Sequence, residues 1–146
     1  MSGMKRLGIA IALLTAACGS GGLGPVPVPV DKASCAVCGM LVSDPRTTAQ
    51  AVAAGEDPRF YDDIGCAASD RTLPKTGTRV YVAAGDGTRW IGAEEAYFAR
   101  VQDLRTPMGY DFAAFFSRSQ AEKHDREGRA RSWAELRSEL SRGGVR

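Results

Sequence analysis

The chain has 146 residues and a formal net charge of +2, from 19 Lys and Arg against 17 Asp and Glu. Two of the positive charges, Lys5 and Arg6, lie in the first 17 residues, and the chain without this segment is net neutral. A neutral domain gives no reason to expect nucleic acid as a partner, because binding nucleic acid requires a concentrated basic surface. The remaining chain, roughly 110 residues after a linker, is enough for one domain with a modest core.

Residues 1–17 have the order found in a secretory signal. A short positive region precedes an apolar run over residues 7–14, and small residues lead from there to Cys18. The apolar run is too short to span a bilayer, which distinguishes it from a transmembrane helix. We therefore predict a signal peptide at residues 1–17.

Cys18 stands at the expected cleavage point, in an arrangement that resembles a bacterial lipobox. The match is incomplete, because Thr15 stands where leucine is usual. We predict that Cys18 carries a lipid and anchors the chain in the cell envelope, on the periplasmic face. An ordinary signal peptide cut nearby, or a short uncleaved anchor, is the alternative. Gly19 does not supply a retention signal of the Asp type, which favours the outer membrane.

Residues 18–34 are predicted to form a tether of two kinds. The glycine-rich first half should be flexible, whereas alternating Pro and Val over residues 25–30 favour an extended, polyproline-like form. Such a tether would let the domain reach away from its anchor. We place the single folded domain at residues 35–146.

The first half of this domain has the order strand, strand, helix, strand. The strands are expected at residues 47–53, 59–61 and 78–83. Asp62 or Asp63 is expected to cap the helix, which runs through Cys66 to about Arg71.

The second half repeats this order over residues 97–131. Strands are expected at 97–101, 112–116 and 129–131, a helix from a cap at Ser119 to Glu127, and a final helix capped by Ser132. A short helix at 93–95 precedes the repeat. The pattern predicts an α+β domain with small antiparallel sheets.

Three sulfur side chains, Cys35, Cys38 and Met40, fall within six positions around a glycine. Thiolates and thioethers are soft donors, which suit Cu(I) better than magnesium, calcium or manganese. With Cys18 lipidated, only Cys35, Cys38 and Cys66 remain, and three cysteines cannot all pair. A free thiol in a compartment that favours disulfides needs a reason, and metal ligation is one.

Two other uses of a Cys-x-x-Cys pair stay open. A thiol–disulfide oxidoreductase would use the pair as a redox switch, although such pairs work best at the start of a helix. A structural zinc site would need two more ligands, for which Cys66 and His124 are the available Cys and His residues. The neighbours of His124 are charged, which is also typical of a solvated helix face.

A Cu(I) site needs only two or three soft ligands. Cys38 and Met40 are the first candidates, and Met108, in a Pro-Met-Gly turn, or Cys66 could complete the site. Cys35 could bind the metal or pair with Cys66. A position left open would let copper move to a partner by ligand exchange.

The sequence lacks the usual signatures of an enzyme. It has one histidine, no Gly-x-Ser-x-Gly motif and no phosphate-binding loop. Asp62 and Asp63 are expected to be helix caps rather than acid–base catalysts. We therefore predict a protein that is not an enzyme and has no small-molecule substrate.

These segments together resemble the NosL family, lipoprotein copper chaperones that assist the assembly of nitrous oxide reductase in denitrification. The matching segments, in chain order, are Cys35-Ala36-Val37-Cys38-Gly39-Met40, Ala49-Gln50, Phe60-Tyr61-Asp62-Asp63-Ile64-Gly65-Cys66, Trp90, Thr106-Pro107-Met108-Gly109 and residues 112–116.

The resemblance implies a pair of ββαβ units, similar in topology to part of organomercurial lyase. It also implies a Cu(I) site of Cys and Met, with Cys38 and Met40 first and Met108 next. Cys35, Cys66 and His124 remain open as further ligands. The implied partner is nitrous oxide reductase or its assembly machinery.

Overall fold

The structure is a computed structural model that describes residues 22–85 and 87–142. The predicted signal peptide and Cys18 lie outside the described residues. Within those ranges, none of the helices has the length and apolar character needed to cross a membrane. The elements are β1 (Ala49–Ala53), β2 (Arg59–Tyr61), α1 (Ile64–Ser69), β3 (Thr78–Ala84), β4 (Arg89–Gly92), the 3-10 helix η1 (Ala93–Glu95), β5 (Tyr97–Arg100), β6 (Phe112–Phe115), α2 (Arg118–His124) and α3 (Trp133–Arg142).

The six strands of the described residues form one sheet in the order β2-β1-β3-β6-β5, with β4 also paired to β3. The predicted α+β fold class is confirmed, and β1, β2, α1 and β3 form the first ββαβ unit. In the second unit, β5, β6 and α2 are followed by a single bridge between Phe98 and Arg131 in place of a full strand.

The sheet differs in one respect from the small antiparallel sheets that we predicted. β3 and β6 pair in parallel at Ala84 and Ala114, which joins the two units into one mixed sheet. Joining the units satisfies backbone groups that two separate sheets would leave at exposed edges.

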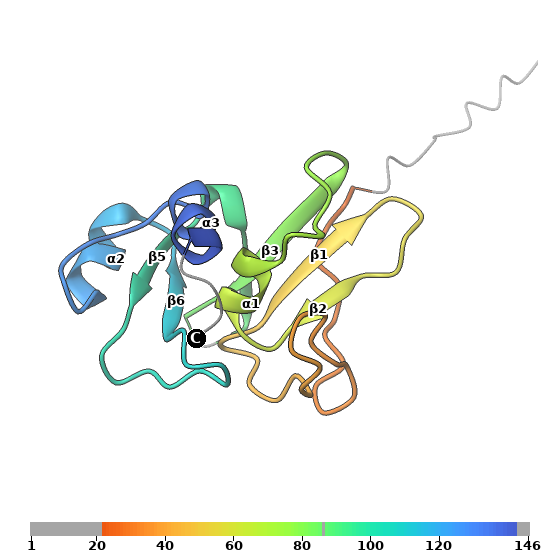
Figure 1. Cartoon of the computed structure of the whole chain (residues 1–146), viewed down its shortest axis with the longest axis horizontal. Coiled ribbons are helices and arrows are strands. Elements are labelled where there is room, and N and C mark those ends of the chain that lie inside the picture. Colours follow the sequence, from red (N-terminus) through yellow and green to blue (C-terminus); the bar gives the residue numbers. More distant parts are fainter. Residues whose placement is uncertain (1–21, 86, 143–146) are drawn as a thin grey trace, which may run out of the picture.

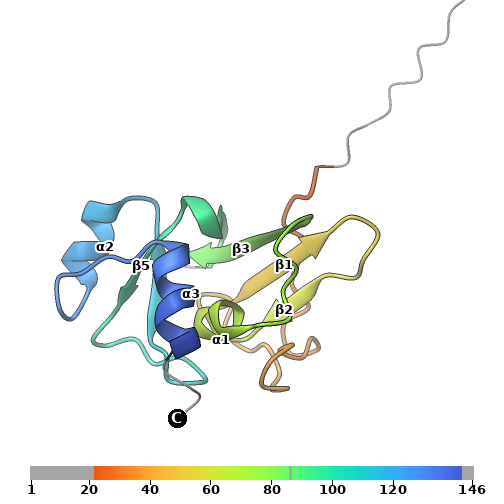
Figure 2. The same cartoon turned by 45° about the horizontal axis from the view of Figure 1, so that its top comes forward.

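Helices cover both faces of the sheet. α1 and α3 lie side by side over one face, where their buried side chains share a core with β1, β3 and β6 (Figures 1 and 2). Phe98 of β5 belongs to this core and lies 5.6 Å from Trp133 of α3, measured between ring centroids. Its neighbour Ala99 packs with Ala121 of α2 instead. Because successive residues of a strand point to opposite faces, α2 covers the other face of the sheet.

The helix starts follow the capping rules with one correction. Asp63 caps α1, and Ser132 and Glu135 form the reciprocal capping box of α3. The predicted cap of α2 at Ser119 is wrong: Ser117 is the cap, and its hydroxyl accepts the N–H of Gln120 at 3.3 Å.

The predicted end of α2 at Glu127 is also wrong, because the helix ends at His124. Asp125 already has extended backbone angles, with ψ at 138°. Its carboxylate accepts the N–H groups of Glu127 and Arg129, and this local pairing replaces the helical hydrogen bonds.

The N-terminal segment contacts the face of the sheet opposite α1. The side-chain amide of Gln50, which is fully buried, donates to the Val26 carbonyl at 3.0 Å and accepts the Val26 N–H at 2.8 Å. Tyr81, the register partner of Gln50, donates its hydroxyl to the carbonyl of Leu23. The segment therefore runs behind β1 in Figure 1. The boundary at residue 35 stays a prediction, but within the described part of the chain contacts with the sheet begin at Leu23.

Candidate metal centre

Residues 34–41 form a closed loop that presents two of the cysteines. Ser34 and Leu41 pair as an antiparallel bridge, and the N–H of Cys35 donates to the carbonyl of Met40 at 2.7 Å. Gly39 has φ of +76°, a left-handed conformation that costs glycine little, and its N–H donates to the carbonyl of Cys35. We call this segment the cysteine loop.

The cysteine loop is held against the strand that leads into α1. Cys35 bridges in parallel with Phe60, and the N–H of Ala36 donates to the Phe60 carbonyl at 2.8 Å. The chain then passes from β2 through Asp63 into α1, whose third residue is Cys66. This connection brings Cys66 opposite the loop.

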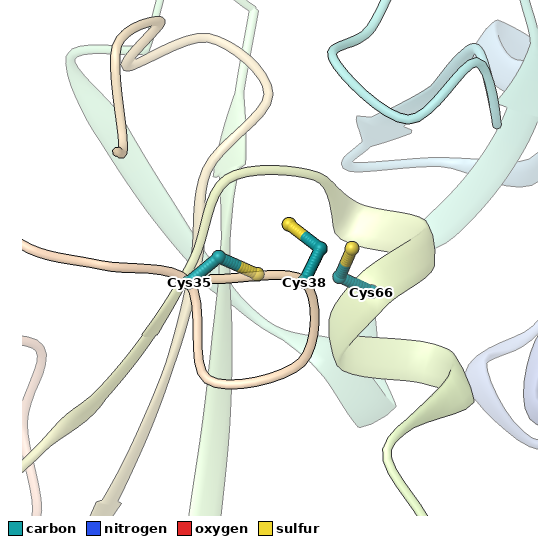
Figure 3. Close-up of side chains that lie close together, drawn as sticks. All are labelled: Cys35, Cys38 and Cys66. Atoms are coloured by element: carbon teal, nitrogen blue, oxygen red, sulfur yellow. The ribbon is translucent and has the colours of Figure 1, made fainter. Parts of the chain in front are cut away.

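The three cysteine sulfurs converge, with every pair within 4.8 Å (Figure 3). All three thiols are free. Cys35 and Cys66 are buried, at 3% and 1% exposure, whereas Cys38 is half-buried. We call these three residues the sulfur cluster; it is reached from solvent through Cys38.

The three thiols of the sulfur cluster differ in pKa. The S–H of Cys66 and backbone N–H groups, including that of Cys38, point at Cys35 and lower the pKa of its thiol well below the ordinary value. The same pairing, together with burial, raises the pKa of Cys66. Burial also raises the pKa of Cys38, against the opposing effect of the Met40 N–H. Of the three side chains, Cys35 is therefore the one that most readily becomes a thiolate.

Two buried carboxylates lie beside the cluster and add negative charge. Asp62 accepts the N–H of Ser43 at 3.5 Å, and burial raises its pKa. Burial likewise raises the pKa of Asp63, the cap of α1. Asp63 is a helix cap as predicted from sequence, whereas Asp62 instead accepts the N–H of Ser43. The negative charge of these carboxylates opposes the ionisation of further cysteine thiols and favours a bound cation.

The two candidate thioethers lie at the outer edge of this region. Met40 is 40% exposed and follows Cys38 by two residues, so it is tied to the cluster through the cysteine loop. Met108 is 39% exposed, and its N–H donates to Asp63 at 3.2 Å. Asp63 thus fixes the Pro-Met-Gly turn at the start of the helix that carries Cys66.

His124, the remaining candidate ligand, is not brought to the cluster. It ends α2, which covers the opposite face of the sheet, and its ring stacks on Phe115 with centroids 5.1 Å apart. Figures 1 and 2 both place α2 at the far end of the sheet from α1. Its ligand role stays a prediction that this geometry does not support.

Tyr110 and Gly65 form a close packing contact next to Cys66 that the sequence analysis missed. A Cβ on Gly65 would overlap the Tyr110 ring, so only glycine permits this close packing of the Met108 loop on α1. A glycine inside a helix next to a cysteine was the available signal, since such a position often marks a close approach.

Replacing Gly65 with Ala should destabilise the protein by about 1–3 kcal/mol, because the added methyl group forces the Tyr110 ring off the helix. Chemical denaturation measures the change in free energy of unfolding. In a Tyr110→Ala background the same Gly65→Ala change should cost less than half as much. Equal costs in both backgrounds would contradict this contact.

A family model described as NosL matches residues 27–141. The chain belongs to the NosL family. The NosL match includes the cysteine loop, α1 and the Met108 turn, and it begins within the N-terminal segment that contacts Gln50. This confirms the resemblance inferred from the residues. No curated protein matches the chain. As a NosL protein, it has a cluster of three cysteines whose soft donors are compatible with metal binding.

Proposed function

We propose that this NosL protein is a copper chaperone that binds one Cu(I) and delivers it to the copper centres of nitrous oxide reductase. It acts from a lipid anchor on Cys18 at the periplasmic face of the envelope and is not an enzyme. The observation that supports this most is the convergence of three free thiols within 4.8 Å, with one of them half-exposed.

The chemistry of the donors favours Cu(I) over zinc. Soft thiolates and thioethers select Cu(I), and two or three of them suffice. A structural zinc site takes four ligands, and the fourth ligand in our alternative, His124, lies on the other face of the sheet. The nearby Met40 and Met108 add thioethers, which serve Cu(I) rather than zinc.

We assign the copper to Cys35 and Cys38 as thiolates, with Met40 as a thioether at the exposed edge. Cys35 supplies the thiolate that forms more readily, because its pKa is lowered, and Cys38 contributes a second thiolate on losing its proton. One Cu(I) then leaves a net charge of −1 among the bound sulfurs, whereas three thiolates beside Asp62 and Asp63 would cost more.

The exposed edge of the site suits transfer to another protein. Cys38 is half-buried, Met40 is exposed, and Cys35 and Cys66 lie behind them. A ligand of the acceptor protein can therefore approach from the Cys38 side and replace the copper ligands one at a time. Val37 and Leu41, at 44% and 52% exposure, give the same loop an apolar surface.

An anaerobic Cu(I) titration against a competing chelator tests the binding. We expect one Cu(I) per chain, about 100-fold weaker binding in Cys38→Ser and about tenfold weaker binding in Met40→Leu, the latter being about 1.4 kcal/mol. His124→Ala is the matched control and should bind as the wild type does. No tight binding, or binding unchanged in both loop variants, would refute the proposal, as would zinc retained at one ion per chain.

Transfer to the client requires a separate experiment. The Cu(I)-loaded chain is mixed with metal-free nitrous oxide reductase, and the copper content of the enzyme is measured after separation. We expect copper to move to the enzyme faster from the wild type than from an equal concentration of Cu(I)–chelator. No transfer would contradict this choice of client.

A further inference from the structure

The sulfur cluster contains one cysteine that the proposed copper ligands do not use. Cys66 is 1% exposed and lies within 4.8 Å of both other sulfurs. Cys35 is likewise buried, at 3% exposure, so Cys35 and Cys66 are the buried pair of the cluster. The buried pair and the half-exposed Cys38 therefore have different surroundings.

We propose that Cys35 and Cys66 form a reversible disulfide that controls how tightly the site holds Cu(I). This rests on the proposed function, because it concerns the same copper site. The reduced chain offers Cys35, Cys38 and Met40 to copper. The oxidised chain offers Cys38 and Met40 only, so it binds copper more weakly and releases it more readily.

Oxidation enters through Cys38, the thiol that solvent reaches. The Cys38 thiolate attacks one sulfur of an external disulfide, RSSR, forming Cys38–S–S–R and releasing RS⁻, which takes up the Cys38 proton. The Cys35 thiolate then attacks the Cys38 sulfur and releases a second RS⁻, which takes a proton from solvent. Attack of Cys66 on the Cys35 sulfur completes the Cys35–Cys66 bond, and the released Cys38 thiolate takes up the Cys66 proton. In total, the Cys35 thiolate and the Cys66 thiol lose two electrons and one proton, and RSSR takes up these electrons with that proton and one from solvent to become two RSH.

Each of these exchanges needs only small side-chain movements, because all three sulfurs already lie within 4.8 Å of one another. Two features favour the bond to Cys66 as the end product over a bond between Cys35 and Cys38. It closes a loop of about 30 residues rather than one of three, which constrains the unfolded chain more strongly. It also links two fixed elements, the Phe60 bridge and the core helix α1.

A disulfide between Cys35 and Cys66 has to be reduced before the chain can bind copper tightly again. A chain left in an oxidising compartment would accumulate in the disulfide form, and only thiol–disulfide exchange with a dithiol donor would return it to the copper-binding form. The partner that prepares the chain for loading is therefore a protein dithiol.

Disulfide mapping on the copper-free full chain, purified in detergent, tests the bond without relying on copper. The chain is equilibrated with mixtures of reduced and oxidised glutathione, alkylated, digested and analysed by mass spectrometry, with Cys18 peptides counted separately. We expect Cys35 linked to Cys66 and Cys38 alkylated. Cys38→Ser should form the same bond at least tenfold more slowly, because the accessible thiol is missing. In Cys66→Ser the bond should instead join Cys35 and Cys38.

The matching copper measurement uses the same oxidised and reduced samples. We expect the oxidised chain to bind Cu(I) at least tenfold more weakly than the reduced chain, and dithiothreitol to restore the affinity. A Cys35–Cys38 bond in the wild type, no bond at any glutathione ratio, or equal copper affinity of the two forms would overturn the inference. Failure of the reduced chain to bind Cu(I) would instead refute the proposed function. The disulfide mapping separates these two outcomes because it does not depend on copper.

Discussion

Replacing Asp125 with Asn is expected to lower the free energy of unfolding by about 3 kcal/mol, because it removes the more deeply buried of the two carboxylates that pair with Arg131 and leaves only Glu139 as its counterion. The guanidinium of Arg131 is 4% exposed and lies 2.9 Å from the Asp125 carboxylate, which is itself fully buried. The same carboxylate accepts the N–H of Arg100 at 2.7 Å. This group thus connects the end of α2 to β5 and to Arg131, which bridges to Phe98.

Urea denaturation at neutral pH measures this loss, and the exposed ion pair of Arg79 and Glu95 provides the control. Its side chains are 54% and 59% exposed, so Glu95→Gln should change stability by less than about 1 kcal/mol. An Asp125→Asn variant as stable as Glu95→Gln would contradict the role of the buried pair.

The same carboxylate makes the loss depend on pH. Burial works to raise the pKa of Asp125, but the N–H groups of Arg100, Glu127 and Arg129 outweigh it and hold the pKa below 3.8. An acid with a lowered folded-state pKa contributes stability that is present above its unfolded pKa and is lost as the pH falls through the folded value. The difference between wild type and Asp125→Asn should therefore be full above about pH 5 and shrink in stronger acid.

The affinity for Cu(I) is expected to rise about tenfold for each unit of pH between about pH 6 and 8. Over this range the free cluster holds the Cys35 thiolate, while Cys38 and Cys66 keep their protons because their pKa values are raised. Binding copper through Cys35 and Cys38 thiolates then releases one proton, and loss of a proton on binding makes affinity increase with pH.

Competition titrations at several pH values, corrected for the pH dependence of the chelator, measure this slope. The control is Cys66→Ser, which should keep a slope of one because Cys66 is not among the assigned ligands. If the affinity for Cu(I) did not depend on pH, copper would be bound by a single thiolate, with the Cys38 proton moved to Cys35. If the slope were two and fell to one in Cys66→Ser, copper would be bound by three thiolates. Either result would contradict the assigned ligand set.

The sequence predicted most elements because their signals are local. Alternating apolar residues mark β1, β3 and β5, and short-range caps mark α1 and α3. α2 was placed too late because Ser117 and Ser119 offer the same chemistry two residues apart. The Asp125 carboxylate ends this helix through local bonds to Glu127 and Arg129, and no local pattern reveals its further bond to Arg100 of β5.

The candidate metal site was likewise predicted only where its signals are local in the sequence. The Cys-x-x-Cys-Gly-Met spacing identified the cysteine loop, but the position of Cys66 depends on how β2 directs α1 against that loop. Sequence spacing does not show which sulfur a third cysteine approaches. It therefore left open whether Cys35 is a metal ligand or a disulfide partner. The structure brings all three together, so Cys35 can serve both functions in turn. Likewise, only the fold shows that Asp63 holds the Met108 turn.

If Cys18 carries the proposed lipid, the path of the N-terminal segment bears on which way the sulfur cluster faces relative to a membrane. It crosses the back of the sheet from Leu23, beside Tyr81, to the cysteine loop, so its first described residues and the cluster lie at opposite ends of β1 (Figures 1 and 2). With the proposed lipid on Cys18, the domain would be oriented with its cysteine loop away from the bilayer. A soluble acceptor could then dock on the copper side without contacting lipid, and the bilayer surface would not compete for the exposed methionines.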